Sequence, residues 1–274
     1  MKYLKIIALL GLLIASRQAA GQTIEDLEYY FSRIAVEPAE SEMLIYNDSL
    51  TSSLLFYLQS LDDVIETDIP EVKYLGQIVP SDSLLKIFSW NIPLTADKNL
   101  YNCIIHNGKT GDNILLQSSE GMESLDNETI INSDKWYGSL YYDIEPVAKS
   151  GDMTYILLGY DPGNVSANSK VVEILHFDGQ GKPLFGKMII RVNEKMLSRM
   201  IFRYSPLATM MLRFMNDRTG IIFDHLSPAS PEYKGQYRYY GPDFSYDLLQ
   251  INEGELILME DFDFKYTDGQ SLQP

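Results

Sequence analysis

The residues of this chain that could do chemistry gather in one stretch, residues 221–249, with the sequence IIFDHLSPASPEYKGQYRYYGPDFSYDLL. Its first apolar run ends in Asp224 and His225, and a loop with two prolines and several tyrosines follows. Neighbouring side chains on a strand point to opposite faces, so Asp224 and His225 cannot form a dyad with each other. The candidate binding residues are Asp224, His225, Tyr240, Asp243, Tyr246 and Asp247.

Two interpretations of this stretch are open. In the structural one, aspartates and tyrosines form a hydrogen-bonded clamp between a strand ending at Leu226 and a strand beginning near Ser245, because buried hydroxyls and carboxylates need partners. In the functional one, the same groups bind a ligand and the tyrosines stack on a sugar. The clamp would consist of Asp224, Tyr240, Asp243 and Tyr246, with the Asp243 carboxylate accepting nearby backbone N–H groups.

Metal binding has weaker support. The three histidines, His106, His176 and His225, lack the close spacing that marks many zinc sites, which need three or four converging ligands. Asp261 and Asp263 are two residues apart, so on a strand they would share a face and could hold a cation. A solvent-facing strand edge kept soluble by charge explains the same pair. We therefore expect no cofactor.

Hydrolysis by paired carboxylates is the remaining candidate chemistry. A glycosidase needs two carboxyl groups about 5–5.5 Å apart for retention, or about 6.5–9.5 Å apart for inversion. No Gly-x-Ser-x-Gly motif marks a serine nucleophile. Cys103 lies in an apolar run typical of a buried strand, and the DGQGKP segment predicts a hairpin turn rather than a phosphate loop. The candidate carboxylates are Glu145, Asp224, Asp243, Asp247, Asp261 and Asp263.

The elements that must position these residues change character after Pro70. Before it, apolar residues recur every three or four positions, first over 23–34 and then over 50–65, which predicts two or three helices. Pro38 suits the start of the second helix, and residues 48–49 could cap a further one.

After Pro70, short runs rich in Tyr, Phe, Ile and Val alternate with Gly, Asn and Asp joints, as in antiparallel hairpins. The predicted fold is mainly β, an antiparallel meander forming a curved open barrel or stacked sheets, with an N-terminal helical segment. An irregular small β-propeller is the alternative. The expected strands cover 83–90, 100–106, 113–119, 136–144, 153–160, 170–177, 184–192, 199–205, 208–215, 220–226, 245–251 and 255–264.

The first 21 residues are typical of an export signal. Lys2 and Lys5 flank the start of a short apolar core, and the small residues Ala19 and Gly21 favour cleavage before Gln22. The apolar run of about 10 residues is too short to span a membrane as a helix. We expect an exported protein, periplasmic or extracellular, with a signal peptide over 1–21, a helical segment over 22–70, a β domain over 71–264 and a loose tail over 265–274.

The composition limits the classes of partner. Acidic residues outnumber basic ones by 38 to 22, and the net charge of −16 repels nucleic acid and anionic lipid headgroups. No later segment is apolar and long enough to cross a membrane. We therefore expect an acidic protein with no nucleic-acid partner and no membrane-spanning segment, and its single cysteine permits no internal disulfide.

Several segments, among them KVVEILHFDGQGKPLFG, IFRYSPLATMMLRF and YGPDFSYD, resemble a family of exported hypothetical proteins from Bacteroides-type Gram-negative bacteria. The resemblance covers about residues 81–263, and the order of the segments is fairly specific. The family has no assigned activity, so the resemblance implies export from a Gram-negative cell and brings no catalytic residues.

These features predict an exported, non-enzymatic accessory or binding protein of the periplasm or outer surface, with an unidentified protein or glycan as its partner. The alternative is a secreted hydrolase that uses carboxylates to act on a glycan. Two carboxyl groups at catalytic separation in an aromatic-lined cleft would favour the enzyme.

Overall fold

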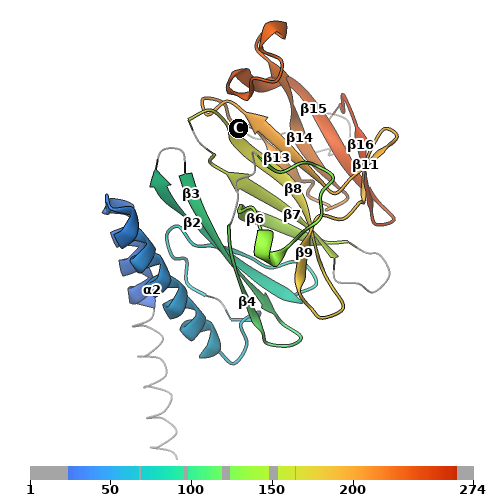
Figure 1. The fold of residues 1–274 in the computed structure, drawn as a ribbon. Helices are drawn as coiled ribbons and strands as arrows, with labels where there is room; N and C mark the ends of the chain where they lie inside the picture. Colours follow the sequence, from blue (N-terminus) through green and yellow to red (C-terminus); the bar gives the residue numbers. More distant parts are fainter. Residues whose placement is uncertain are drawn as a thin grey trace, which may run out of the picture.

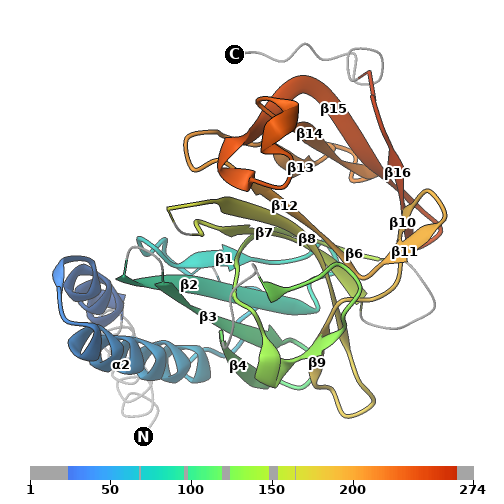
Figure 2. The ribbon, with the colours of Figure 1, turned by 45° about the horizontal axis from the view of Figure 1, so that its top comes forward.

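The computed structural model describes residues 24–67, 69–95, 98–118, 124–147, 154–163 and 165–263. The expected export signal and C-terminal tail lie outside the described residues. Two helices and three β-sheets are stacked in four layers (Figure 1; Figure 2). Three buried apolar clusters fill the spaces between the layers, so the mainly β prediction is confirmed.

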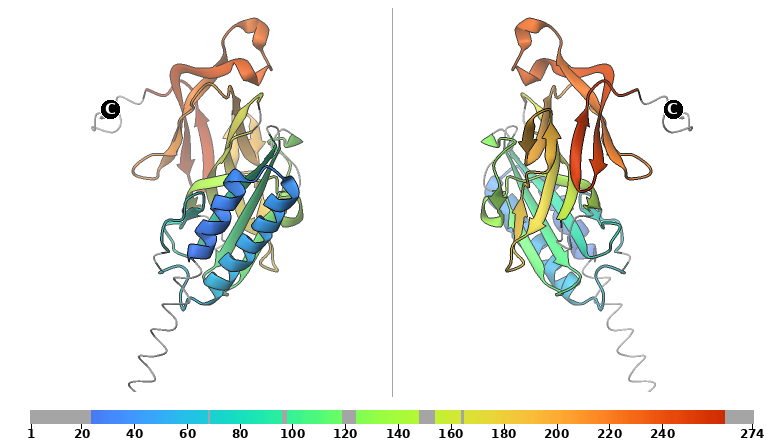
Figure 3. Two further views of the ribbon diagram at one scale, coloured as in Figure 1. Left: turned by 90° about the vertical axis from the view of Figure 1, so that its left-hand side faces the viewer. Right: turned by 90° about the vertical axis from the view of Figure 1, so that its right-hand side faces the viewer.

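The helical layer contains a helix over 24–36 and α2 (Glu40–Gln59), which lie side by side across one sheet (Figure 3). The prediction of a separate helix capped at 48–49 was wrong, because the buried stripe of α2 continues without interruption from Met43 through Asn47 to Leu50. The predicted apolar faces are confirmed over 24–34 and 50–58, but α2 ends at Gln59, so the helical repeat expected to continue to Ile65 was wrong. The buried residues of the two helices include Leu27, Phe31, Ile34, Leu50, Leu54 and Leu58.

The first sheet consists of four consecutive antiparallel strands, β1 (Gly76–Ile78), β2 (Leu85–Thr95), β3 (Lys98–Asn107) and β4 (Asn113–Gln117). Both of its faces are buried. Alternate residues of β2 point to opposite faces, so Phe88 and Trp90 pack on the helices while Leu85 and Ile87 pack on the next sheet. The Trp90 indole N–H donates a hydrogen bond to Asn47 Oδ1 at 2.9 Å, which ties α2 to this sheet.

The middle sheet lies between the other two. Tyr155 and Leu157 of its central strand β7 face the first sheet, whereas Ile156 and Leu158 face the outer sheet. Burial of both faces explains why this part of the sequence reads as continuous apolar runs. The strands are β5 (Ile131–Asn132), β6 (Leu140–Pro146), β7 (Thr154–Asp161), β8 (Asn168–Phe177), β9 (Pro183–Phe185) and β12 (Arg199–Tyr204).

The outer sheet is built from a second meander with a hairpin added at its edge. The hairpin joins through a parallel pairing of β10 with β16, unlike the antiparallel pairs elsewhere. The expected strand over 184–192 is divided between two sheets, and the chain leaves the middle sheet at Gly186, whose φ is 95°. The strands are β10 (Ile190–Val192), β11 (Lys195–Leu197), β13 (Leu212–Phe214), β14 (Gly220–Pro228), β15 (Tyr240–Asn252) and β16 (Glu255–Met259).

The sheets stack face to face, which confirms the stacked-sheet form of the predicted meander and differs from the radial blades of the alternative propeller. The described strands close no barrel. The predicted DGQGKP hairpin turn is confirmed, because the Asp178 carboxylate accepts the backbone N–H groups of Gln180 and Lys182 at 2.8 and 2.9 Å. The very short strands β1, β5 and β11 were not predicted.

A buried ion pair joins β8 to β12. Arg199 Nε donates to Glu173 Oε2 at 2.8 Å, both side chains are fully buried, and the Tyr137 hydroxyl donates to the same carboxylate oxygen at 2.7 Å. The Arg199 guanidinium also donates to the backbone carbonyls of Asp126, Thr129 and Phe185. This network fixes the segment before β5 against the middle sheet.

Candidate functional site

The sequence-predicted candidates lie on β14 and β15, and their side chains divide into separate contacts. Asp224 Oδ2 accepts the backbone N–H of Met211 at 2.6 Å, and His225 Nδ1 lies 2.9 Å from Asp247 Oδ2. The two neighbours therefore have different partners, as the strand geometry predicts. The structure brings His225 and Asp247 together and leaves Asp224 outside that pair.

A bulge interrupts the pairing of β14 with β15 at His225. Opposite this single residue stand the three residues 243–245. Phe244, in the middle of the three, has a φ of 74° and is 95% exposed. Positive φ is rare for a bulky residue, and bulges of this kind often lie beside functional sites. His225 remains a partly exposed imidazole next to a buried carboxylate.

The electrostatics of this histidine follow from the carboxylates around it. The hydrogen bond that the imidazole donates to Asp247 raises the pKa of His225, burial opposes that rise, and the charges of Asp247, Asp243 and Asp261 add to it. Asp247 is itself held by the backbone N–H of Asp261 at 3.1 Å. The arrangement favours a protonated, hydrogen-bonded imidazole.

The predicted clamp has different members in the structure. Asp243 accepts the backbone N–H and the hydroxyl of Ser245 at 3.2 and 2.8 Å, so its main contacts are local, as its position after Gly-Pro predicts. The Tyr240 hydroxyl accepts the N–H of Gly235 within its own loop. Tyr246 pairs with Asp224 through the strand register. Side-chain links between the two strands include the bond between His225 and Asp247 and a hydrogen bond between Ser227 and Asp243.

The proposed cation pair does not share a strand face. Strand β16 ends at Met259, so Asp261 and Asp263 lie beyond it, and Asp261 has a φ of 54°. Among the residues that the structure describes, no group of three or more His, Cys, Asp or Glu side chains is arranged to hold a metal ion. Cys103 is fully buried, as its apolar run predicts, and burial raises the pKa of its thiol.

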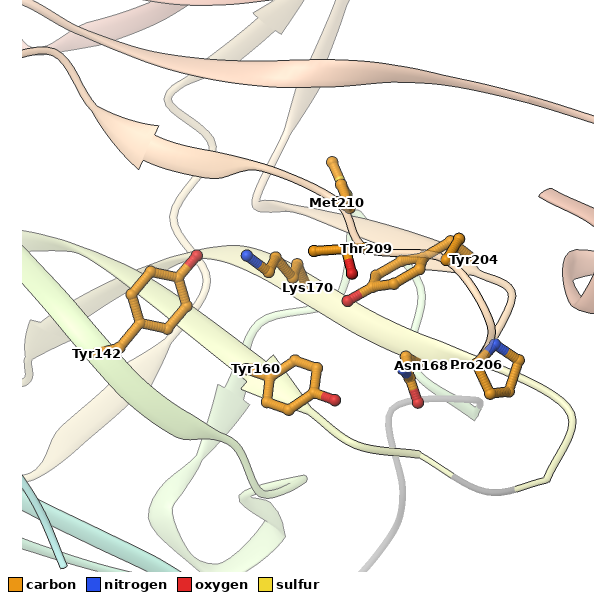
Figure 4. Close-up of a pocket in the computed structure, with 9 residues that line it drawn as sticks. Tyr142, Tyr160, Asn168, Lys170, Tyr204, Pro206, Thr209 and Met210 are labelled. Carbon is orange, nitrogen blue, oxygen red and sulfur yellow. The ribbon is translucent and has the colours of Figure 1, made fainter. Parts of the chain in front are cut away.

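A pocket of about 520 Å³ lies between the middle sheet and the loop before β13, where β7 ends and β8 begins (Figure 4). Its size falls within the range of about 300–1,000 Å³ typical of small-molecule sites. Strands β6, β7, β8 and β12 and the loop before β13 supply its walls. The lining residues are Tyr142, Tyr160, Asn168, Lys170, Tyr204, Pro206, Ala208, Thr209 and Met210.

Polar groups in this pocket are available to a ligand. The hydroxyls of Tyr160, Tyr204 and Thr209 and the side-chain amide of Asn168 make no hydrogen bond with any described residue. Tyr204 is only 3% exposed, and burial, followed by the neighbouring Tyr160, raises the pKa of its hydroxyl to about 12, so this group remains a donor. The Tyr142 hydroxyl, in contrast, donates to the Leu212 carbonyl at 2.8 Å.

Lys170 places one half-buried cation in the same pocket. Its Nζ lies 5.3 Å from the centroid of the Tyr142 ring, and no carboxylate of the described chain lies within 4 Å of it. Burial lowers the pKa of Lys170, and the charge of Asp224 opposes that shift. Figure 4 shows the amino group between Tyr142 and Tyr204 in this view.

A neighbouring pocket of about 400 Å³ shares Tyr142 and Tyr160 with the first one. Its other wall comes from residues 71–76, where the exposed Tyr74 has a φ of 73°. Lys73 Nζ lies 4.7 Å from the centroid of the Tyr74 ring. Each of the two pockets therefore has a lysine over a tyrosine ring.

Sequence reasoning missed Tyr142, Tyr160, Lys170 and Tyr204 as site residues. They belong to four neighbouring strands of the middle sheet, and only the pairing of these strands brings them to one pocket. The available signal was Lys170 itself, a charge at the start of an apolar strand whose faces are both covered.

No family model matches the chain, and a search of curated proteins found no similar protein. Among the described residues there is no helix long and apolar enough to cross a membrane. The fold and the site therefore define this protein as a four-layer stack of helices and sheets with a ligand-sized pocket between its middle sheet and the loop before β13.

Proposed function

We propose that this chain is an exported, non-enzymatic binding protein of the periplasm or outer surface, and that its ligand occupies the pocket lined by Tyr160, Lys170 and Tyr204. The observation that carries the proposal is the convergence of polar side chains that have no partner among the described residues. These groups face an open pocket, where the polar groups of a ligand can replace the water that hydrates them. Export is supported by the N-terminal signal pattern.

The alternative function, hydrolysis of a glycan, has less support. A carboxylate mechanism needs two carboxyl groups on either side of the scissile bond. None of the 9 residues that line the pocket is Asp or Glu. Asp243 and Asp247 lie on β15 and engage Ser245 and His225 instead. The lining is therefore suited to binding rather than to acid–base cleavage.

Filling the pocket tests the proposal. Thr209 is exposed and lines the pocket, so Thr209→Trp should occupy the cavity without disturbing the core. Leu207 lies in the same loop, is 98% exposed and does not line the pocket, so Leu207→Trp is the matched control. The two variants add the same indole at positions two residues apart.

The measurement is the melting temperature in the presence of a panel of neutral sugars, sugar acids, amino acids and nucleosides at about 10 mM, because a ligand that binds the native state raises it. We expect at least one compound to stabilise the unmodified protein and Leu207→Trp but not Thr209→Trp. Stabilisation of Thr209→Trp to the same degree, or no stabilisation by any compound, would contradict the proposal.

A further inference from the structure

On the basis of the proposed binding function, we infer that the ligand is a sugar acid, a polar ring bearing a carboxylate, and that Lys170 binds the carboxylate. Lys170 is the only lysine or arginine among the 9 residues that line the pocket.

The ammonium of Lys170 lacks an anionic partner in the described chain. Its Nζ rests 5.3 Å from the Tyr142 ring centroid, and no described carboxylate lies within 4 Å. The Asp224 carboxylate, which accepts the Met211 backbone N–H at 2.6 Å, acts on Lys170 through its charge but lies more than 4 Å from the ammonium. A partly desolvated cation is stabilised by an anion that can form a charge-assisted hydrogen bond with it.

The tyrosines provide a surface for a ring. Tyr142 is 39% exposed, and Tyr160 is half-buried beside it on the adjacent strand. Aromatic rings have large apolar faces, and the C–H face of a sugar ring packs on such a surface while its hydroxyls point outward. Pro206 and Met210 add apolar contact on the opposite wall.

The remaining polar groups match a polyhydroxylated ligand. Tyr160, Tyr204 and Thr209 each supply a hydroxyl that can donate and accept, and Asn168 supplies an amide with both functions. A neutral sugar would satisfy these groups and leave the Lys170 ammonium unpaired. A cationic ligand would be repelled by it. A sugar acid offers hydroxyls to the polar groups and a carboxylate to the Lys170 ammonium.

The neighbouring pocket bears on the source of the sugar acid. It shares Tyr142 and Tyr160 with the first pocket and contains Lys73 against the Tyr74 ring. A free monosaccharide and the end of an acidic oligosaccharide offer the same carboxylate to Lys170. Only the oligosaccharide has a second carboxylate for the region of Lys73.

Calorimetric titration distinguishes these cases. The probes are D-galacturonate, D-galactose, which lacks the carboxylate, and tri-galacturonate. The variants are Lys170→Gln and, as a control for net charge, Lys234→Gln, whose lysine is exposed and lines neither pocket. We expect D-galacturonate to bind on the order of tenfold more tightly than D-galactose, and we expect Lys170→Gln alone to remove that difference.

The outcomes separate the ligand class from the proposed function. Equal affinity for D-galacturonate and D-galactose, or an unchanged preference in Lys170→Gln, would overturn the sugar-acid inference. If the binding is nevertheless lost in Thr209→Trp, the proposed binding site remains supported. No binding of either sugar would also overturn the inference. If no compound of the panel stabilises the protein, the proposed function is overturned as well. Tighter binding of tri-galacturonate than of the monosaccharide would identify an acidic oligosaccharide as the source of the ligand. Equal binding would identify the free sugar acid.

Discussion

At the scale of single residues, His225 is the group whose protonation should affect stability. Its hydrogen bond to Asp247, together with the charges of Asp247, Asp243 and Asp261, raises the pKa of His225 above its ordinary value of 6.5. A group whose pKa is raised by folding stabilises the folded state. This stabilisation is fully present below the pKa of the unfolded state and is lost as the pH rises through the pKa of the folded state.

We expect the melting temperature of the unmodified protein to exceed that of His225→Gln most at about pH 5.5 and least at about pH 8.5, because glutamine keeps a hydrogen bond but does not titrate. Thermal melts of both proteins across this range provide the measurement. A difference that is constant with pH, or that grows as the pH rises, would show that the imidazole charge makes no such contribution.

Burial distinguishes the two aspartates of β15. Asp247 is 5% exposed and contacts His225 and the Asp261 N–H, whereas Asp243 is exposed and caps a local turn. We expect Asp247→Ala to lower the free energy of unfolding by roughly 1–3 kcal/mol, the cost of leaving buried groups unpaired. Asp243→Ala should cost less, and urea denaturation of the two variants gives the comparison. A larger loss in Asp243→Ala would restore the clamp expected from the sequence.

Part of the residue-level detail could be predicted and part could not. The separate directions of Asp224 and His225 follow from strand alternation, and the local role of Asp243 follows from its place after Gly-Pro. The contact of His225 with Asp247 depends on the register that places Asp247 opposite Phe223, on the same face of the sheet as His225, and this register has no clear signature in one sequence.

At the scale of elements, the buried ion pair holds β8 and β12 together. Arg199→Met would leave the Glu173 carboxylate buried without its counter-ion, so we expect a loss of about 3–5 kcal/mol in the free energy of unfolding. The double variant with Glu173→Leu should recover only part of this loss, because the backbone carbonyls to which Arg199 donates would still lack its hydrogen bonds. A double-mutant cycle by chemical denaturation measures the coupling. Additive losses would show that the two side chains act independently.

The long elements were predictable and the short ones were not. The helical stripe of α2 and the apolar runs of β2, β3, β7 and β8 carry strong periodicity or continuous burial. Strands β1, β5 and β11 have two or three residues, too few for any period to appear. The run over 184–192 was assigned to one strand because its sequence does not reveal that the chain changes sheets at Gly186.

At the scale of the whole molecule, the helices cover one face of the first sheet. Without them, the face formed by Phe88, Trp90 and Ile92 would be exposed as an apolar patch. A chain that begins at Val72 should therefore aggregate or bind a hydrophobic dye strongly, as size-exclusion chromatography and dye fluorescence would show. A soluble monomer with native near-ultraviolet dichroism would contradict this account of the layers.

The pocket is built on the middle sheet, since its walls come from four strands of that sheet and from the loop before β13. Chemical-shift mapping of the isotopically labelled protein, with whichever panel compound stabilises it most, locates the site directly. We predict that the largest changes fall on residues 158–160, 168–170 and 204–211, at the pocket between the middle sheet and the loop before β13. Changes centred on His225 and Asp247 instead would place the ligand at the bulge of β14 and β15 and contradict the proposed site.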